Sequence, residues 1–367
     1  MSNDNIKQSG DSRTPDHLRV LEFHGSEQEI GHLHGQQLRE EIGLFYDDLL
    51  EQMCTDGGTT EDDLLSYSRA HLPAAMDYAP ELVDEMRGIA EGAGFPFGKV
   101  LLINCFDEVC WHGPQVLKKS LHGCTAFAAT GRATVDGKCY VGQSWDVPTY
   151  YPAVFFRLVR DSGAITLILS HPGMIGGTGL SSSGLALVWT SLKSNDAGIG
   201  VPATFVVRKA LQASDLGGLI GNVITASRAN GMNFIAGDAI AAVDIELTAT
   251  RYQVTYSHGI LSRANHYESP ELLGFEANLP DTVPDTYLRS GRMKELLQQH
   301  ESTIDLEVMK NIYCDHASAP GSICRHESLG FHTCVSLIYD PAEGVVWASN
   351  GRPCEAGFVQ YSLAPQS

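Results

Sequence analysis

The chain has 367 residues, 43% of them hydrophobic, which suffices for a sizeable core in one large domain or two ordinary ones. Its 25 lysines and arginines are outnumbered by 44 aspartates and glutamates, and the resulting formal charge of −19 excludes nucleic acids and anionic membrane surfaces as expected partners. No apolar run reaches membrane-spanning length, and residues 1–16 lack the basic and apolar regions of a signal peptide, which predicts a soluble, cytoplasmic protein.

The nine cysteines form an odd, scattered set in a chain without an export signal, so we expect them to be reduced. None is arranged as Cys-x-x-Cys, and no group of cysteines and histidines has zinc-finger spacing. The sequence therefore predicts no structural metal and no cofactor, and Cys324 is interpreted as a packed thiol.

The first third of the chain is predicted to be mostly helical after a disordered tail at residues 1–16. A strand is expected at residues 18–23, and Ser26 with Glu29 forms a capping box that opens a helix. Two further helices are expected, one through the 60s and 70s and one over residues 80–92. The first helix is predicted to bury an apolar stripe of Ile30, Leu38, Ile42, Phe45 and Leu49.

The rest of the chain is predicted to mix strands with helices. Because strands and helices follow one another without a strict βαβ rhythm, we expect an α+β fold with antiparallel sheets covered by helices. Ser214 is the expected N-cap of the helix at 216–229, and residues 135–138 are expected to form a hairpin turn. The other helices are expected at 203–213 and 287–299, and the strands at 125–129, 139–145, 153–160, 164–170, 185–190, 233–235, 239–247, 251–257, 333–339 and 344–349.

Two further motifs do not predict a ligand site. His32 and His34 lie two residues apart in a helical pattern, where they do not share a face, so solvated or core histidines are favoured over a metal pair. The run Gly176–Gly179 lacks the Gly-Lys-[Ser/Thr] ending of a P-loop. We interpret it as a turn between two strands, near the pocket.

The stretch Leu121-His122-Gly123-Cys124-Thr125 is a candidate site, because a cysteine follows a glycine at the start of an apolar, strand-like run. Gly123 has no side chain, so the peptide before Cys124 can be strained and open to attack by the thiol. Cleavage there would leave a thiol and an α-amine on one residue. A cysteine in this setting is also typical of a small buried hydrophobe, and the residue types alone leave both interpretations open.

Five separate motifs follow one another along the chain. They are Gly-Cys-Thr-Ala-Phe at 123–127, Val-Gly-Gln-Ser-Trp-Asp at 141–146, Arg-Ala-Asn-His at 263–266, Ser-Ile-Cys-Arg at 322–325 and Thr-Cys-Val-Ser-Leu-Ile-Tyr-Asp at 333–340. In these motifs and in their order the chain resembles the acyl-coenzyme A:6-aminopenicillanic acid acyltransferase family, peptidase family C45 of the N-terminal nucleophile hydrolases. Segments 29–35 and 85–92 also resemble the N-terminal part of that family, so the resemblance runs from about residue 18 to 360.

The resemblance implies a four-layer αββα sandwich made as a precursor that cuts itself between Gly123 and Cys124. Residues 17–123 would form the α chain and residues 124–367 the β chain, both within one compact domain. By motif, the resemblance implies that Cys124 is the nucleophile and that the other catalytic residues are Asp146, Asn265 and Arg325.

These residue types suit that chemistry. A free α-amine has a pKa of about 7.7–8.0, so it can act as the general base without a histidine. Asn265 would donate an amide N–H to the oxyanion, and Asp146 and Arg325 carry opposite charges that could pair and orient the amine. Taken singly, Asp146 is also consistent with a strand end, Asn265 with a turn cap and Arg325 with a surface ion pair.

The resemblance therefore implies an amidohydrolase or acyltransferase that works through an acyl thioester on Cys124. Its substrate would be a small amide or acyl thioester, and acyl-coenzyme A is one such thioester. A homo-oligomer is also compatible with the sequence. The alternative is an unprocessed, catalytically inactive binding or scaffold protein with the same fold.

Overall fold

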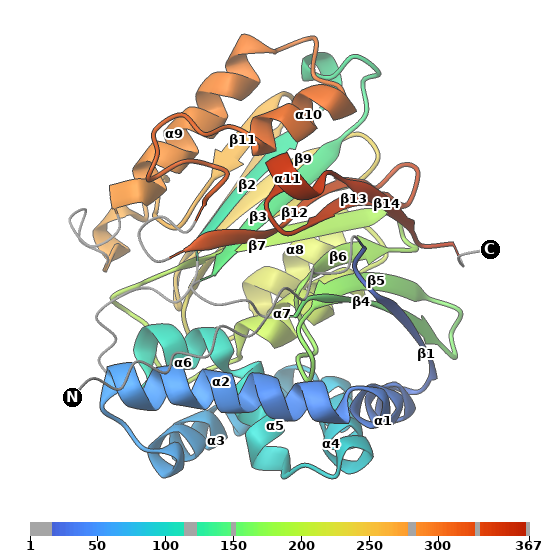
Figure 1. The fold of residues 1–367 in the computed structure, drawn as a ribbon, viewed down its shortest axis with the longest axis vertical. Helices are drawn as coiled ribbons and strands as arrows, with labels where there is room; N and C mark the ends of the chain where they lie inside the picture. The colour runs from blue at the N-terminus through green and yellow to red at the C-terminus, as the bar shows by residue number, and fades with distance from the viewer. Residues whose placement is uncertain (1–16, 114–122, 148–151, 278–283, 327–330, 365–367) are drawn as a thin grey trace, which may run out of the picture.

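The computed structural model describes residues 17–113, 123–147, 152–277, 284–326 and 331–364. The predicted tail at residues 1–16 lies outside the described residues. Two β-sheets stack face to face and helices cover both outer faces, which gives four layers (Figure 1). This arrangement confirms the predicted α+β class and the αββα sandwich.

One sheet has eight strands, and all of its neighbouring strands are antiparallel except the first two in space, β1 and β4, which are parallel. In spatial order the strands are β1 (Val20–Gly25), β4 (Val154–Arg160), β5 (Ile165–Ser170), β6 (Thr178–Ser181), β7 (Leu185–Leu192), β8 (Gly231–Gly237), β9 (Ala242–Leu247) and β10 (Tyr252–Ser257).

The other sheet has six strands and is antiparallel throughout. All residues of its second strand are buried, because one face meets the eight-stranded sheet and the other meets helices. This explains why the strand is mainly apolar, with Thr125 its one hydroxyl side chain, and does not alternate with exposed polar residues. The spatial order is β11 (Ile260–Arg263), β2 (Gly123–Ala129), β3 (Tyr140–Val147), β12 (His332–Asp340), β13 (Val345–Asn350) and β14 (Val359–Ser362).

The helices fall into two outer layers. Those on the six-stranded sheet are α9 (Pro284–Gln299) and α10 (Leu306–Tyr313), and the short α11 (Pro353–Ala356) lies beside β13. Those beyond the eight-stranded sheet are α1 (Glu27–Gln37), α2 (Arg39–Gly57), α3 (Glu61–Tyr78), α4 (Pro80–Ala93), α5 (Phe97–Asn104), α6 (Phe106–His112), α7 (Ala203–Leu211) and α8 (Leu216–Thr225) (Figure 1). Among the described residues, no helix combines the length and apolar character needed to cross a membrane.

The local predictions differ from the structure at a few points. The stripe from Ile30 to Leu49 is buried as predicted, but α1 and α2 are separate helices, because Leu38 leaves helical geometry at φ −116° and ψ 23°. The N-cap of α8 is Asp215 rather than Ser214, since the Asp215 carboxylate accepts the Gly218 N–H at 2.8 Å. Thr178 and Gly179, the second half of the turn predicted at 176–179, instead begin strand β6.

Helices α1 and α4 approach closely because glycines line their contact. Gly31 and Gly35 of α1 meet Gly88 and Gly92 of α4, and residues four apart share a helix face. A Cβ atom at any of the four would lie 2.0–2.2 Å from a backbone oxygen of the other helix. Gly92 was predicted to end α4, but it serves this contact, and Gly94 at φ +63° ends the helix instead.

We expect Gly88→Ala to lower the free energy of unfolding by at least about 1–3 kcal/mol, because the added methyl group forces α1 away from α4. The matched control is Gly43→Ala in α2, where a Cβ meets nothing within 4 Å and a helix-favouring residue should stabilise the protein by about 0.4–1 kcal/mol. Urea denaturation of both variants measures the difference. Equal effects of the two substitutions would contradict this account of the contact.

Candidate active site

Cys124 is the second residue of β2, between β11 and β3 in the six-stranded sheet. It is 7% exposed, and it lies opposite Trp145 of β3, while Gly123 lies opposite Asp146. The sheet register therefore places the predicted cleavage site directly beside the predicted Asp146.

Asn265, just after β11, faces the backbone of Cys124. Its Oδ1 accepts the Cys124 N–H at 2.8 Å and an Arg289 Nη2 hydrogen at 3.0 Å, while its Nδ2 donates to the Ser191 carbonyl at 3.1 Å. Two donors on one side and a carbonyl on the other determine which way the amide points. Nδ2 carries two hydrogens, and the bond to Ser191 uses one of them.

Two arginines and two aspartates lie together beside Cys124, and we call Asp146, Asp285, Arg289 and Arg325 the buried charge cluster. All but the partly exposed Asp285 are fully or almost fully buried. Arg289 Nε donates to Asp285 Oδ2 at 3.1 Å, and Arg325 Nη2 donates to the same oxygen. Arg325 Nε lies 3.3 Å from Asp146 Oδ2. The formal charges cancel, which offsets the cost of removing each charge from water.

Arg289 connects the buried charge cluster to Cys124. Its Nη1 donates to the Cys124 carbonyl and, at 2.8 Å, to Thr125 Oγ1, in addition to the Nη2 bond to Asn265. The planar guanidinium can serve these acceptors at once because its five N–H groups have a fixed geometry. Arg289 therefore fixes the backbone of Cys124 and the amide that faces it.

Burial dominates the titration of this site. The pKa of the Cys124 thiol is raised to about 12, chiefly by burial and then by the Asp146 charge, against the opposing effects of Arg289 and a hydrogen bond with Gln143. Burial also raises the pKa of Asp146, although Arg325 and Arg289 oppose it. The Cys124 thiol is therefore protonated at neutral pH and needs a base to become a nucleophile.

A small apolar pocket opens beside Cys124, with a volume of about 70 Å³. This is well below the roughly 300–1,000 Å³ of pockets for drug-sized ligands, so the pocket admits only a small group while Gly123 is in place. Gly176 and Gly177 also border it, as expected for the turn near the pocket. Most of the lining is apolar or aromatic and comes from Phe106, Trp145, Val147, His171, Met174 and Trp189.

The structure brings all four predicted catalytic residues into one connected network. Cys124 contacts Asn265 directly, Asp146 pairs with Arg325, and Arg289 links the two halves. Arg289 and Asp285 were not predicted. The signal for them was an Asp–Arg pair four residues apart at the start of a helix, but the helix was predicted to begin at Tyr287, after Asp285.

The two histidines of α1 behave as predicted, one solvated and one in the core. His32 is exposed. His34 is buried, which lowers its pKa to about 3, and its neutral Nε2 accepts the Gly173 N–H at 2.8 Å.

Residues 133–355 match the sequence model of the family described as acyl-coenzyme A:6-aminopenicillanic acid acyl-transferase. The matched region contains Asp146, Asn265 and Arg325, and Cys124 lies just before it.

Several solved structures are similar to this chain. An N-acylethanolamine-hydrolyzing acid amidase ortholog of Caenorhabditis elegans is 14% identical over 66% of this chain and 100% of its own, with a TM-score of 0.45. A mutant conjugated bile acid hydrolase of Clostridium perfringens is 10% identical over 65% of this chain and 92% of its own, with a TM-score of 0.43. A penicillin V acylase of Agrobacterium tumefaciens is 11% identical over 62% and 83%, with a TM-score of 0.39.

We expect Arg289→Met, made in the Cys124→Ala variant, to lower the free energy of unfolding by about 3–5 kcal/mol, because it leaves Arg325 alone with the buried Asp146 and the partly buried Asp285. The matched control is Arg292→Met on the same helix, whose partly exposed ion pairs should contribute only about 0–1 kcal/mol. Urea denaturation compares the two. A similar loss of unfolding free energy in both variants would show that the buried charge cluster contributes no more to stability than the exposed ion pairs do.

Proposed function

Because the chain belongs to the acyl-coenzyme A:6-aminopenicillanic acid acyl-transferase family, we propose that it is a self-cleaving amidohydrolase or acyltransferase whose nucleophile is the Cys124 thiol. Membership of the family supports an enzyme that hydrolyses or transfers acyl groups. The observation that carries the finer proposal is the 2.8 Å hydrogen bond from the Cys124 N–H to Asn265 Oδ1, because it prepares a place for the amine that cleavage would release.

In the proposed maturation, Cys124 Sγ attacks the Gly123 carbonyl carbon and the Gly123–Cys124 peptide bond breaks. The nitrogen leaves as the α-amine of Cys124, taking up a proton, and the acyl group passes to sulfur as a thioester. Water then hydrolyses the thioester and leaves a Gly123 carboxylate and a free thiol. Arg289 supports this step by holding the Cys124 carbonyl and Thr125 in place.

In the proposed turnover, the α-amine takes the proton of the Cys124 thiol, which then attacks the acyl carbon of the substrate. Asn265 Oδ1 accepts one N–H of the amine and so aims its lone pair. The second hydrogen of Asn265 Nδ2 is available to the oxyanion. The amine returns the proton to the leaving group, and water or an amine acceptor then releases the acyl group from Cys124.

The pocket supports a preference for an apolar acyl group. Trp145, Val147, Met174 and Trp189 present mainly carbon to it, and burying an apolar chain there is favourable. Gly123 also lines the pocket, so the end of the released α chain would border the acyl site. We propose that small amides or acyl thioesters with apolar acyl groups are the substrates.

We expect the purified chain to separate, on denaturing gels and by intact mass, into fragments of 123 residues and the remaining 244 of the 367. Cys124→Ala should stay whole, because it has no thiol to attack Gly123. Cys139→Ala is the control, since Cys139 is also a buried free cysteine but lies outside the site. A wild-type chain that persists uncut would favour the inactive binding protein, and cleavage in Cys124→Ala would refute the thiol mechanism.

We expect Asn265→Ala to be cut and yet to lose about 10²–10³-fold in kcat, the usual effect of removing an oxyanion donor. Release of amine from simple N-acyl amides, or of thiol from acyl thioesters, gives the rate. Asn195→Ala is the control, because its amide bonds the surface carbonyl of Gly274. Wild-type turnover in the Asn265 variant would remove this residue from the mechanism.

A further inference from the structure

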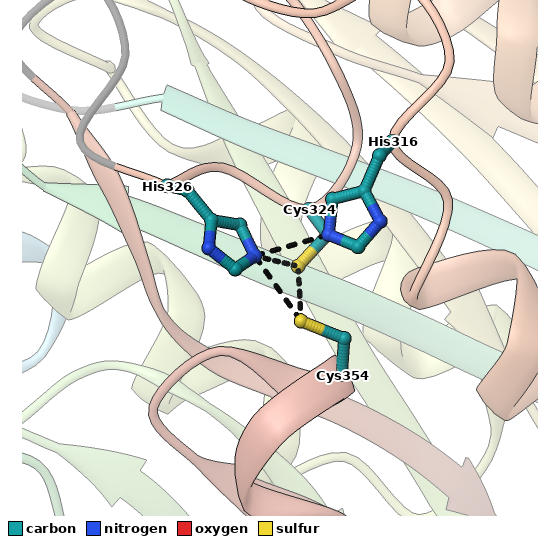
Figure 2. Close-up of side chains that lie close together, drawn as sticks. All are labelled: His316, Cys324, His326 and Cys354. Carbon is teal, nitrogen blue, oxygen red and sulfur yellow. Dashed lines mark hydrogen bonds between the residues drawn. The ribbon is translucent and has the colours of Figure 1, made fainter.

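Four side chains of types that can ligate a metal meet outside the lining of the apolar pocket, and all but the buried Cys324 are exposed. His316 follows α10, Cys324 and His326 lie before β12, and Cys354 belongs to α11. Their ligand atoms all lie within 4.8 Å of one another. Figure 2 shows the two imidazoles and two thiols turned toward a common centre. We call these residues the Cys2His2 cluster.

Four of the six distances between these atoms can be compared directly with those of a tetrahedral site, and they differ from its values by about 0.5 Å or less. Bonds of about 2.3 Å to sulfur and 2.0–2.1 Å to nitrogen place two sulfurs about 3.8 Å apart, sulfur and nitrogen about 3.6 Å apart, and two nitrogens about 3.3–3.4 Å apart. The sulfurs of Cys324 and Cys354 are 3.6 Å apart. His326 Nε2 lies 3.7 Å from Cys324 Sγ, 3.1 Å from Cys354 Sγ and 3.0 Å from His316 Nε2 (Figure 2).

Hydrogen bonding does not account for this convergence. His326 Nε2 lies close to three polar atoms, but a ring nitrogen has a single in-plane position for either a proton or a lone pair. It can therefore satisfy only one of them by a directed hydrogen bond. A cation at the centre would accept the lone pairs of all four ligand atoms at once.

We propose that the Cys2His2 cluster binds one Zn²⁺ ion. Tetrahedral sites with two thiolates and two imidazoles favour zinc, and a site filled by four protein ligands is structural rather than catalytic. Two thiolates balance the charge of the ion. The other ring nitrogen of His326, Nδ1, lies 3.5 Å from Glu355 Oε1, as is usual for a ligating histidine oriented by a carboxylate.

The zinc site would also hold Arg325 in position. Arg325 stands between the ligands Cys324 and His326, and its side chain points the other way, toward Asp146 and Asp285. Fixing the neighbours on both sides restricts the backbone from which the guanidinium extends. The bound metal would thus restrain the position of Arg325 within the buried charge cluster. Metal binding itself does not depend on the proposed catalytic function.

The test is the metal content of the full chain, expressed with zinc and dialysed against metal-free buffer, by elemental mass spectrometry. We expect about one zinc per wild-type chain and less than about a tenth of that in Cys354→Ser and His316→Ala, whose exposed positions should leave the fold intact by circular dichroism. Cys314→Ser is the matched control and should keep its zinc, because its sulfur is outside the cluster.

Cobalt gives an independent readout. Co²⁺ added to the zinc-free chain should produce the visible bands of a tetrahedral site and a thiolate-to-cobalt charge-transfer band, both absent in Cys354→Ser. Removing zinc should also lower the Tm of the wild type but not that of His316→Ala. Any of four results would overturn the assignment. They are a wild-type chain without metal, full zinc content in Cys354→Ser, loss of zinc in Cys314→Ser, and a Cys324–Cys354 disulfide in the purified protein.

Discussion

The candidate site depends on four charged side chains, of which all but the partly exposed Asp285 are almost removed from water. Arg289 and Arg325 are 2% and 1% exposed and Asp146 is fully buried, so each charge is tolerated only because opposite charges surround it. These residues come from β3, α9 and the segment before β12, and Arg289 extends the network to β2. A shift of any one element would leave a buried charge uncompensated. The position of Cys124 is thus coupled to the packing of the whole six-stranded sheet and its helices.

The N-terminal helices shape the pocket from the opposite side. His34 of α1 accepts the Gly173 N–H, and Asn104 of α5 accepts the Ile175 N–H at 2.8 Å while donating to the Gly173 carbonyl at 2.9 Å. These bonds hold the segment between β5 and β6, which supplies Met174 and two glycines to the pocket lining. The close contact of α1 with α4 keeps His34 in place. The part of the chain before Cys124 therefore helps to build the site.

The sequence predicted the fold class and most strands, because hydrophobic periodicity is a local signal. The four residues named from motifs lie together in the structure, and their catalytic roles stay a prediction. Asp146, Asn265 and Arg325 each sit in a motif that can be compared with a family. Arg289 could not be predicted in this way, since its role depends on α9 crossing the start of β2. Its burial came from tertiary packing rather than from its neighbours in sequence.

The same limit explains why the sequence did not indicate the Cys2His2 cluster. The expectation of no metal rested on the spacing of familiar zinc motifs, in which pairs of ligands come from one short loop. Here Cys324 and His326 are close in sequence, but His316 lies just after α10 and Cys354 belongs to α11. Only the hairpin of β12 and β13 brings Cys354 back to the segment that carries Cys324. The spacing of residues along the sequence does not predict that contact.

The parallel pairing of β1 with β4 has a consequence for how long the protein survives. β1 precedes the Gly123–Cys124 bond and β4 follows it, yet both belong to one sheet. In an uncut chain, refolding is a unimolecular event. If the bond is cut, the two pieces share a sheet without a covalent link, and recovery after unfolding requires them to meet in solution. The mature molecule would then be assembled only once, and its lifetime would be governed by the rate of unfolding rather than by an equilibrium.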